Sequence, residues 1–246
     1  MNEDINSIPY EVVHDHNYAN WFQDYQYSSN VTLTKAERED LAKMIDETVE
    51  QFSEGLPMVY NNLESIKDLH DDYHNIERIF SSVALFAVIT MIDSMIATKL
   101  FILAEKDYDK RFLRGKLKVI LNEGFKRLFG FINTSSFKDS EWARLGSIMK
   151  HFPEAIQFQY QKVTVHLTNS ALSSSWWKDV RDPETHIQAE KLYKSRMEEI
   201  IESEVVRDSL KLFDTFMAVN QFLGEASKCM VNYLLKQRDL GKLKDE

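Results

Sequence analysis

The sequence has few of the residues that interrupt helices and little that could cross-link the chain. Its 246 residues include 7 glycines, 4 prolines and a single cysteine, Cys229. One cysteine excludes an intrachain disulfide framework and a cysteine-based zinc site. Sheet-rich folds need many turns, so the shortage of glycine and proline predicts long helices. Cys229 lies in a helical pattern, where we expect a small buried hydrophobic residue rather than a nucleophile.

A long uninterrupted apolar run is also missing. The most apolar stretch extends from Ile79 to Ile92 and is followed by Asp93. Crossing a bilayer takes roughly 20 apolar residues, so this stretch is interpreted as part of a buried central helix, Ile76–Ala104. That helix is expected to be the longest and most buried of the chain.

The N-terminus has no apolar run that could serve as a signal peptide, and Glu3 and Asp4 make it acidic. A cytoplasmic location is therefore expected by default. The net charge of −9 does not suit a protein that wraps duplex nucleic acid. It still allows an enzyme that holds a few phosphates locally, because the local field matters more than the total charge.

The predicted fold is all-α: a single helical-bundle domain over residues 34–246, preceded by an irregular aromatic arm over residues 1–33. A hydrophobic content of 43% and a charged content of 28% are ordinary for one globular domain. The arm has no clean period and carries six aromatic residues, so it is expected to be pinned to the domain. They are Tyr10, Tyr18, Trp21, Phe22, Tyr25 and Tyr27.

Helix boundaries follow from capping patterns. Thr34 and Glu37 form a capping-box pair that predicts a helix start. Gly55 is expected to end that helix, and Pro57 to lie in the first turn of the next one. Further helices are predicted from Asp107 to Ile132, around Trp142, Leu145 and Met149, and from Pro153 onward. For Val163–Leu167 the alternation also allows a strand.

The last long helix has apolar residues spaced as in a heptad seam, from Leu212 to Tyr233. We expect a symmetric homodimer whose interface is helped by this seam or by Trp176 and Trp177.

Metal-binding patterns are sparse. Asp71 and His74 form one acid-x-x-His pair without the matching second pair that a di-metal site needs. His14 and His16 lie in the irregular arm without a third ligand nearby in the sequence. No metal or cofactor is therefore expected.

The candidate catalytic residues are Arg181, Asp182 and His186, in the segment Arg-Asp-Pro-Glu-Thr-His. Asp182 is expected to cap a helix whose first turn contains Pro183. Arg181 and His186 then occupy positions whose side chains meet across a helix start, beside free backbone N–H groups. A guanidinium can grip a phosphate, and an imidazole can move a proton near neutral pH. The pair therefore suits attack of an RNA 2′-hydroxyl on the adjacent phosphodiester.

A structural interpretation of the same residues stays open. His186 could be a core histidine bonded to Glu184 or to a carbonyl, with Arg181 bonded to a carboxylate. An arginine followed by a histidine after four to six residues also occurs at Arg144 and His151, without a polar residue after the arginine or a helix start, and we interpret that pair as a chance match.

The segment from Trp176 to Ile187, with its Arg-polar-x-x-x-His motif, resembles the signature of the HEPN superfamily and looks like the Cthe-type HEPN group of prokaryotic proteins. The resemblance implies an all-α bundle, a homodimer and a metal-independent endoribonuclease in a toxin–antitoxin or antiphage system, with an antitoxin as a candidate partner protein. Arg181 would bind the phosphate and His186 would act as general acid and base. Asp182 would fill the polar position, where the family often carries Asn. Other members of the superfamily are non-catalytic interaction modules, which is the alternative function.

One basic cluster supports contact with RNA independently. Between Lys106 and Arg127 there are eight basic residues against three acidic ones, a local +5. Within this cluster, Lys110, Arg111, Arg114 and Lys118 are the predicted RNA-binding residues.

Overall fold

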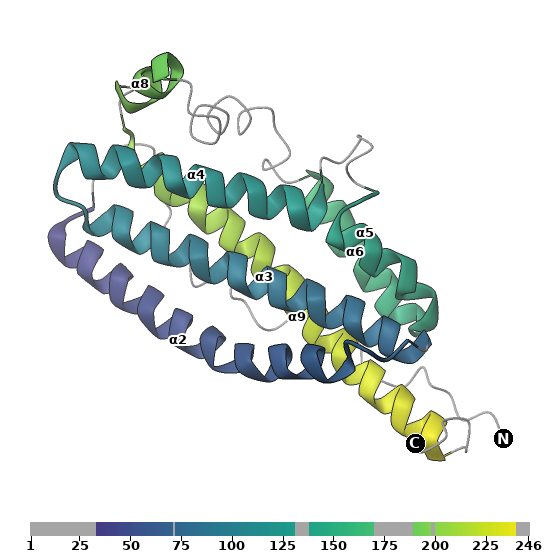
Figure 1. Cartoon of the computed structure of the whole chain (residues 1–246). Coiled ribbons are helices and arrows are strands. Elements are labelled where there is room, and N and C mark those ends of the chain that lie inside the picture. Colours follow the sequence, from purple (N-terminus) through teal and green to yellow (C-terminus); the bar gives the residue numbers. More distant parts are fainter. Residues whose placement is uncertain (1–32, 71, 131–137, 170–188, 198–199, 240–246) are drawn as a thin grey trace.

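The computed structural model describes residues 33–70, 72–130, 138–169, 189–197 and 200–239. These residues form seven α-helices and one short 3-10 helix, and no strand occurs among them. The prediction of an all-α helical bundle is confirmed (Figure 1). Most of the arm lies outside the described residues; its last residue, Leu33, is 7% exposed and belongs to the hydrophobic core.

Helix α2 (Lys35–Ile66) begins as the sequence predicts. The Thr34 hydroxyl accepts from the Glu37 backbone N–H at 3.3 Å, and the Glu37 carboxylate accepts from the Thr34 N–H at 2.7 Å. The predicted break is wrong, because Gly55 and Pro57 both lie inside one continuous helix. Pro57 is exposed, so water can satisfy the carbonyl that loses its intrahelical partner. Packing along α3 holds the two halves in line.

Helix α3 (Asp72–Leu103) is the predicted central helix, and it contacts α2, α4, α5 and α9. It is not the longest, because α9 has 38 residues and α3 has 32. The interpretation of its apolar stretch as too short for a membrane also needs correction. Asp93 does not interrupt the helix, and residues 74–103 are long and apolar enough to cross a bilayer. Core helices of bundles meet the same criterion, and 39% of the most apolar window of α3 is buried inside this bundle.

The middle of the chain forms shorter elements. Helix α4 (Asp107–Phe129) stops before the expected Ile132, because Gly130 adopts φ 67°, where glycine is favoured. Helix α5 (Glu141–Ile148), the 3-10 helix η3 (Met149–His151) and helix α6 (Glu154–Asn169) follow. The strand alternative for Val163–Leu167 is therefore wrong.

Helices α8 (Ala189–Met197) and α9 (Glu202–Asp239) complete the described chain. The middle of the predicted heptad seam of α9 is buried within its own bundle, where Phe216, Val219 and Ala226 are each 0% exposed. Helix α9 packs against α3 and α6, and these seam residues are enclosed by those contacts.

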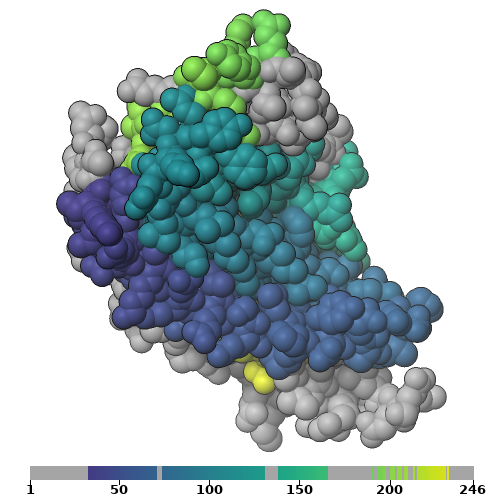
Figure 2. Space-filling model, turned by 60° about the vertical axis from the view of Figure 1, so that its left-hand side comes forward, coloured from purple at the N-terminus to yellow at the C-terminus, as the bar shows by residue number. Residues whose placement is uncertain are grey.

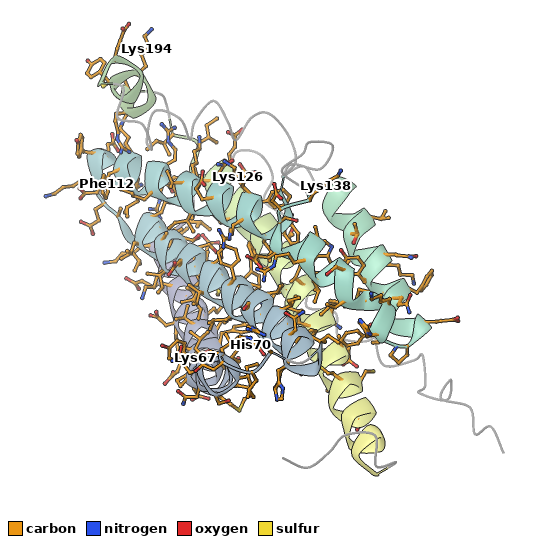
Figure 3. The ribbon with its side chains drawn as sticks, turned by 45° about the vertical axis from the view of Figure 1, so that its right-hand side comes forward. Lys67, His70, Phe112, Lys126, Lys138 and Lys194 are labelled. Atoms are coloured by element: carbon orange, nitrogen blue, oxygen red, sulfur yellow. The ribbon has the colours of Figure 1, made fainter. Side chains whose placement is uncertain are left out.

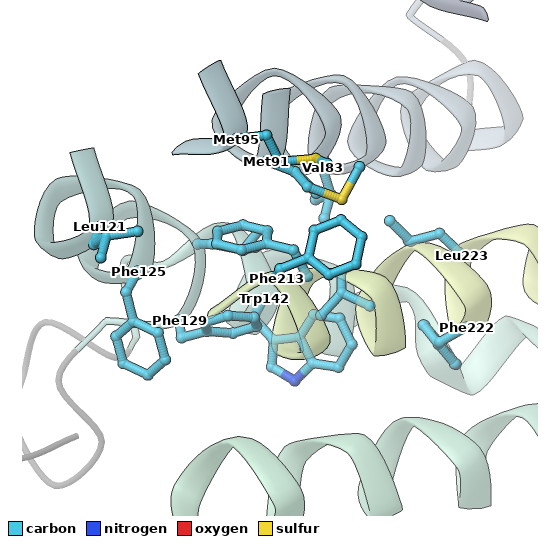
Figure 4. Close-up of a cluster of buried hydrophobic side chains, with 14 of the residues drawn as sticks. Val83, Met91, Met95, Leu121, Phe125, Phe129, Trp142, Phe213, Phe222 and Leu223 are labelled. Carbon is cyan, nitrogen blue, oxygen red and sulfur yellow. The ribbon is translucent and has the colours of Figure 1, made fainter. Parts of the chain in front are cut away.

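The bundle has two layers. Helices α2, α3 and α4 lie side by side, with α3 in the middle, and α9 crosses behind α3 (Figure 1). Aromatic rings fill the space where α4, α5 and α9 meet (Figure 4). The Trp142 ring is 5.7 Å from Phe129 and 5.5 Å from Phe222, between ring centroids.

Candidate functional site

The predicted catalytic residues Arg181, Asp182 and His186 lie outside the described residues, as does the helix start predicted at Asp182. The described chain resumes at Ala189, where helix α8 begins, three residues after His186 in the sequence. The surroundings of α8 are therefore the nearest described structure that follows the motif along the chain.

Helix α8 packs on the first turns of α4, the helix that carries the basic cluster. The Arg111 guanidinium donates to the Arg196 carbonyl, and the Arg196 guanidinium donates to the Arg111 carbonyl. The Arg196 guanidinium also lies over the Phe112 ring, 5.4 Å from its centroid. These contacts fix α8 against α4, at the end where Figure 3 labels Phe112 and Lys194.

The four predicted RNA-binding residues are largely engaged within the protein. Lys110 forms an ion pair with Glu202 at the start of α9. Arg111 bonds to α8, as described above. Arg114 is only 5% exposed, and Lys118 is half-buried and also has a partner within the protein. Two other lysines of the same cluster, Lys106 and Lys116, are exposed.

Glu202 gathers two of the cations at this end of the bundle. Arg38 donates to it at 2.7 Å, and Lys110 pairs with its other carboxylate oxygen. Arg38 also donates to the carbonyls of Leu33 at 3.1 Å and Ile102 at 3.2 Å. One carboxylate thus joins the starts of α2, α4 and α9 beside the end of α3. Sequence reasoning missed this cluster, because its members are up to 164 positions apart and share no local pattern.

The second Arg–His pair has a different setting from that expected of a catalytic motif. Arg144 lies in α5 and donates to Glu141 at 2.7 Å, and Arg127 of α4 lies 3.3 Å from the same carboxylate. His151 is exposed at the end of η3. The Arg144 guanidinium therefore pairs with a carboxylate of its own helix.

Cys229 is half-buried at the edge of the core rather than fully buried. Burial raises the pKa of its thiol, and the nearby Glu225 carboxylate raises it further. A thiol held in its protonated form is a weak nucleophile, which agrees with a packing role.

Of the residues in the predicted metal-binding patterns, only His74 lies in the part of the chain that the structure describes. Asp71, His14 and His16 lie outside it. Within it, no group of three or more His, Cys, Asp or Glu side chains comes together.

Three comparisons were made, with protein-family models, with curated proteins and with solved structures, and none of them returned a match.

Proposed function

We propose that this chain is a metal-independent endoribonuclease of the HEPN type, acting as a cytoplasmic homodimer in a toxin–antitoxin or antiphage system. The observation that carries the proposal is the segment from Arg181 to His186, in which a guanidinium and an imidazole flank a helix-start pattern. Supporting it, helix α8, which follows this segment, packs on the basic helix α4.

Cleavage requires phosphate binding, proton transfer and backbone N–H groups directed at the phosphate. The motif offers one residue for each requirement. Arg181 grips the phosphate through two N–H donors and neutralises charge in the transition state. His186 takes the proton from the 2′-hydroxyl or gives one to the leaving 5′-oxygen. Asp182 caps the helix and directs its backbone N–H groups toward the phosphate. The products are a 2′,3′-cyclic phosphate and a 5′-hydroxyl.

For the wider RNA surface, exposed Lys106 and Lys116 are better placed than the four lysines and arginines predicted from the sequence. Lys110 would have to leave Glu202 to bind a phosphate, and the buried Arg114 would have to leave the protein interior. Each of these changes would cost free energy, because an ion pair or a buried contact would be broken.

The test is RNA cleavage by the purified protein and its variants. We expect cleavage to persist in EDTA and to yield 2′,3′-cyclic phosphate ends, because charge neutralisation and proton transfer come from side chains. His186→Ala should lower the rate by about two to four powers of ten. Arg181→Lys should be severely impaired, because an ammonium does not reproduce the planar two-point grip.

His151→Ala is the matched control, since it removes the histidine of the other Arg–His pair from an exposed position and should leave cleavage unchanged. The proposal fails if His186→Ala melts at a much lower temperature than the wild type while no form cleaves RNA. That result would make His186 a structural residue.

The alternative function is a non-catalytic HEPN-like interaction module that binds a partner protein. The observation that favours it is the apolar outer face of α3, where Ile89, Ile96, Leu100 and Leu103 are each between 38% and 47% exposed. Binding of a partner protein through this face, without any RNA cleavage, would support this alternative function.

A further inference from the structure

Helix α8 lies on the outside of the bundle, above the first turns of α4 (Figure 2). Among the side chains of α8 that the structure describes, Tyr193 is 65% exposed, Met197 59% and Lys194 73%, and Arg196 is half-buried. None of these side chains belongs to the hydrophobic core, to which each of the other six α-helices contributes. The described part of α8 is therefore held by surface contacts and not by core packing.

Helix α8 is too short to be stable alone. It has nine residues, and isolated helices shorter than roughly 12–15 residues are marginal in water, because few backbone hydrogen bonds offset the cost of nucleation. Its Glu190–Lys194 pair is exposed and contributes little. The helix therefore depends on docking to α4, and loss of that docking would also unfold it.

The described docking contacts meet at three residues, which we call the α8 latch: Arg111 and Phe112 of α4, and Arg196 of α8. The Arg111 guanidinium donates to the Arg196 carbonyl, and the Arg196 guanidinium donates to the Arg111 carbonyl. The Arg196 guanidinium also lies 5.4 Å from the centroid of the Phe112 ring. Each arginine thus holds the backbone of the opposite helix, so these contacts are lost together when α8 moves away.

Helix α4 does not need α8 in return. It packs against α3, α5 and α9, and its core residues Leu117, Leu121 and Leu128 are at most 2% exposed. Lys110 of α4 also forms an ion pair with Glu202 of α9. These contacts hold α4 in the bundle independently of the α8 latch.

We propose that α8 is a releasable strap, which detaches from α4 and unfolds as a unit while the rest of the bundle stays folded. Local opening of this kind occurs where few buried apolar contacts hold an element, and the α8 latch sets how often it happens. The docked strap also anchors the chain at Ala189, three residues after His186. Regulation of the Arg181–His186 site by this anchor rests on the proposed function, whereas the strap itself does not.

The test is amide hydrogen exchange of the full chain, measured by mass spectrometry. Residues 193–197 are informative, because their amides lie beyond the first four of the helix and are hydrogen-bonded within α8. In the wild type they should exchange faster than the amides in the middle of α3. Arg196→Met should speed their exchange about tenfold, the size expected for loss of one hydrogen bond, with α3 exchange and the melting curve unchanged.

Lys194→Met is the matched control. It removes a cation from the same helix, but the Lys194 side chain is 73% exposed and pairs only weakly with Glu190, so exchange in α8 should change less than about twofold. Arg111→Met removes the other donor of the α8 latch and should reproduce the effect of Arg196→Met.

Exchange of residues 193–197 no faster than that of α3 would overturn the proposal, because α8 would then open only with the whole bundle. Exchange at the rate of an unstructured peptide would also overturn it, because α8 would not be docked. Equal effects of Arg196→Met and Lys194→Met would remove the role of the latch.

The link to the proposed site has a separate readout. If the wild type cleaves RNA, Arg196→Met should lower the rate by up to about a hundredfold, as expected for a displacement of about 1 Å at a reacting group, and Lys194→Met should not. Unchanged cleavage in Arg196→Met would overturn this regulation. A wild type that cleaves no RNA would refute the nuclease, while the exchange rates would still decide whether α8 is a strap.

Discussion

Single side chains in this bundle act mainly by joining helices, and Tyr160 is the clearest case. Its hydroxyl donates to the Trp142 carbonyl at 2.8 Å, while its ring stacks on the Trp142 indole with centroids 4.8 Å apart. The indole N–H in turn donates to the Thr164 hydroxyl at 2.8 Å. Together these contacts fix α6 against α5.

Tyr160→Phe should therefore lower stability with a dependence on pH. At neutral pH we expect a loss of about 1–2 kcal/mol in the free energy of unfolding, because the Trp142 carbonyl loses its donor. Burial raises the pKa of Tyr160 to about 12 from an ordinary 10. The folded state thus holds this proton more tightly, and the stability that it contributes is present below pH 10 and is lost as pH rises toward 12.

Urea denaturation of both proteins between pH 8 and pH 12 measures this effect. The difference between wild type and Tyr160→Phe should shrink as pH rises through that upper window, since only the wild type carries the titrating phenol. A constant difference at every pH would show that Tyr160 titrates alike in the folded and unfolded chain.

At the scale of elements, whether Gly55 and Pro57 end a helix depends on how the surrounding helix packs and not on the local sequence alone. Gly55 and Pro57 lie within α2 and do not end it, because α3 supports the helix on both sides of them. A Cβ at Gly55 would have no atom within 4 Å, so nothing in the fold requires a glycine there. Gly124 of α4 differs, since a Cβ there would lie 2.2 Å from the Thr90 methyl carbon of α3.

Alanine at these two positions should therefore have opposite effects. Gly55→Ala should stabilise the protein by about 0.4–1 kcal/mol, because it reduces the freedom of the unfolded chain without a clash. Gly124→Ala should destabilise it by about 1–3 kcal/mol, because α3 and α4 would have to move apart. Urea unfolding midpoints measure both changes. Equal effects of the same sign would contradict the close approach of α3 and α4.

At the scale of the whole molecule, Glu202 connects segments that are far apart in the sequence. Its partners Arg38 and Lys110 and its own side chain are 13% to 19% exposed, so all three charges are partly withdrawn from water. Glu202→Ala leaves both cations without this carboxylate, and we expect a loss of about 1–3 kcal/mol.

Glu190→Ala is the control for that change. Glu190 and Lys194 form an exposed pair one helical turn apart, with side chains 86% and 73% exposed, and such pairs contribute little. Chemical denaturation should show a clear loss for Glu202→Ala and almost none for Glu190→Ala. Similar small losses of unfolding free energy in both variants would mean that water solvates the Glu202 carboxylate well, so that its ion pairs contribute little.

The sequence by itself determined the helical class, the capped start of α2 and the identity of the central helix. These properties are local: a capping box needs residues three positions apart, and a buried helix needs a continuous apolar period. The motif of Arg181 and His186 is also a local pattern, and it remains a prediction from the sequence because it lies outside the described residues.

Only the tertiary structure decided what each apolar or charged face does. The apolar residues Ile89, Ile96, Leu100 and Leu103 of α3 follow the same heptad spacing as the α9 seam, yet they are exposed, whereas the middle of the α9 seam is buried inside the bundle. The cations of α4 look available in the sequence, but Glu202 and Arg196 of α8 engage two of them from positions 92 and 85 residues away, respectively. Spacing along one helix shows which residues share a face, whereas the partner of that face depends on how distant helices pack.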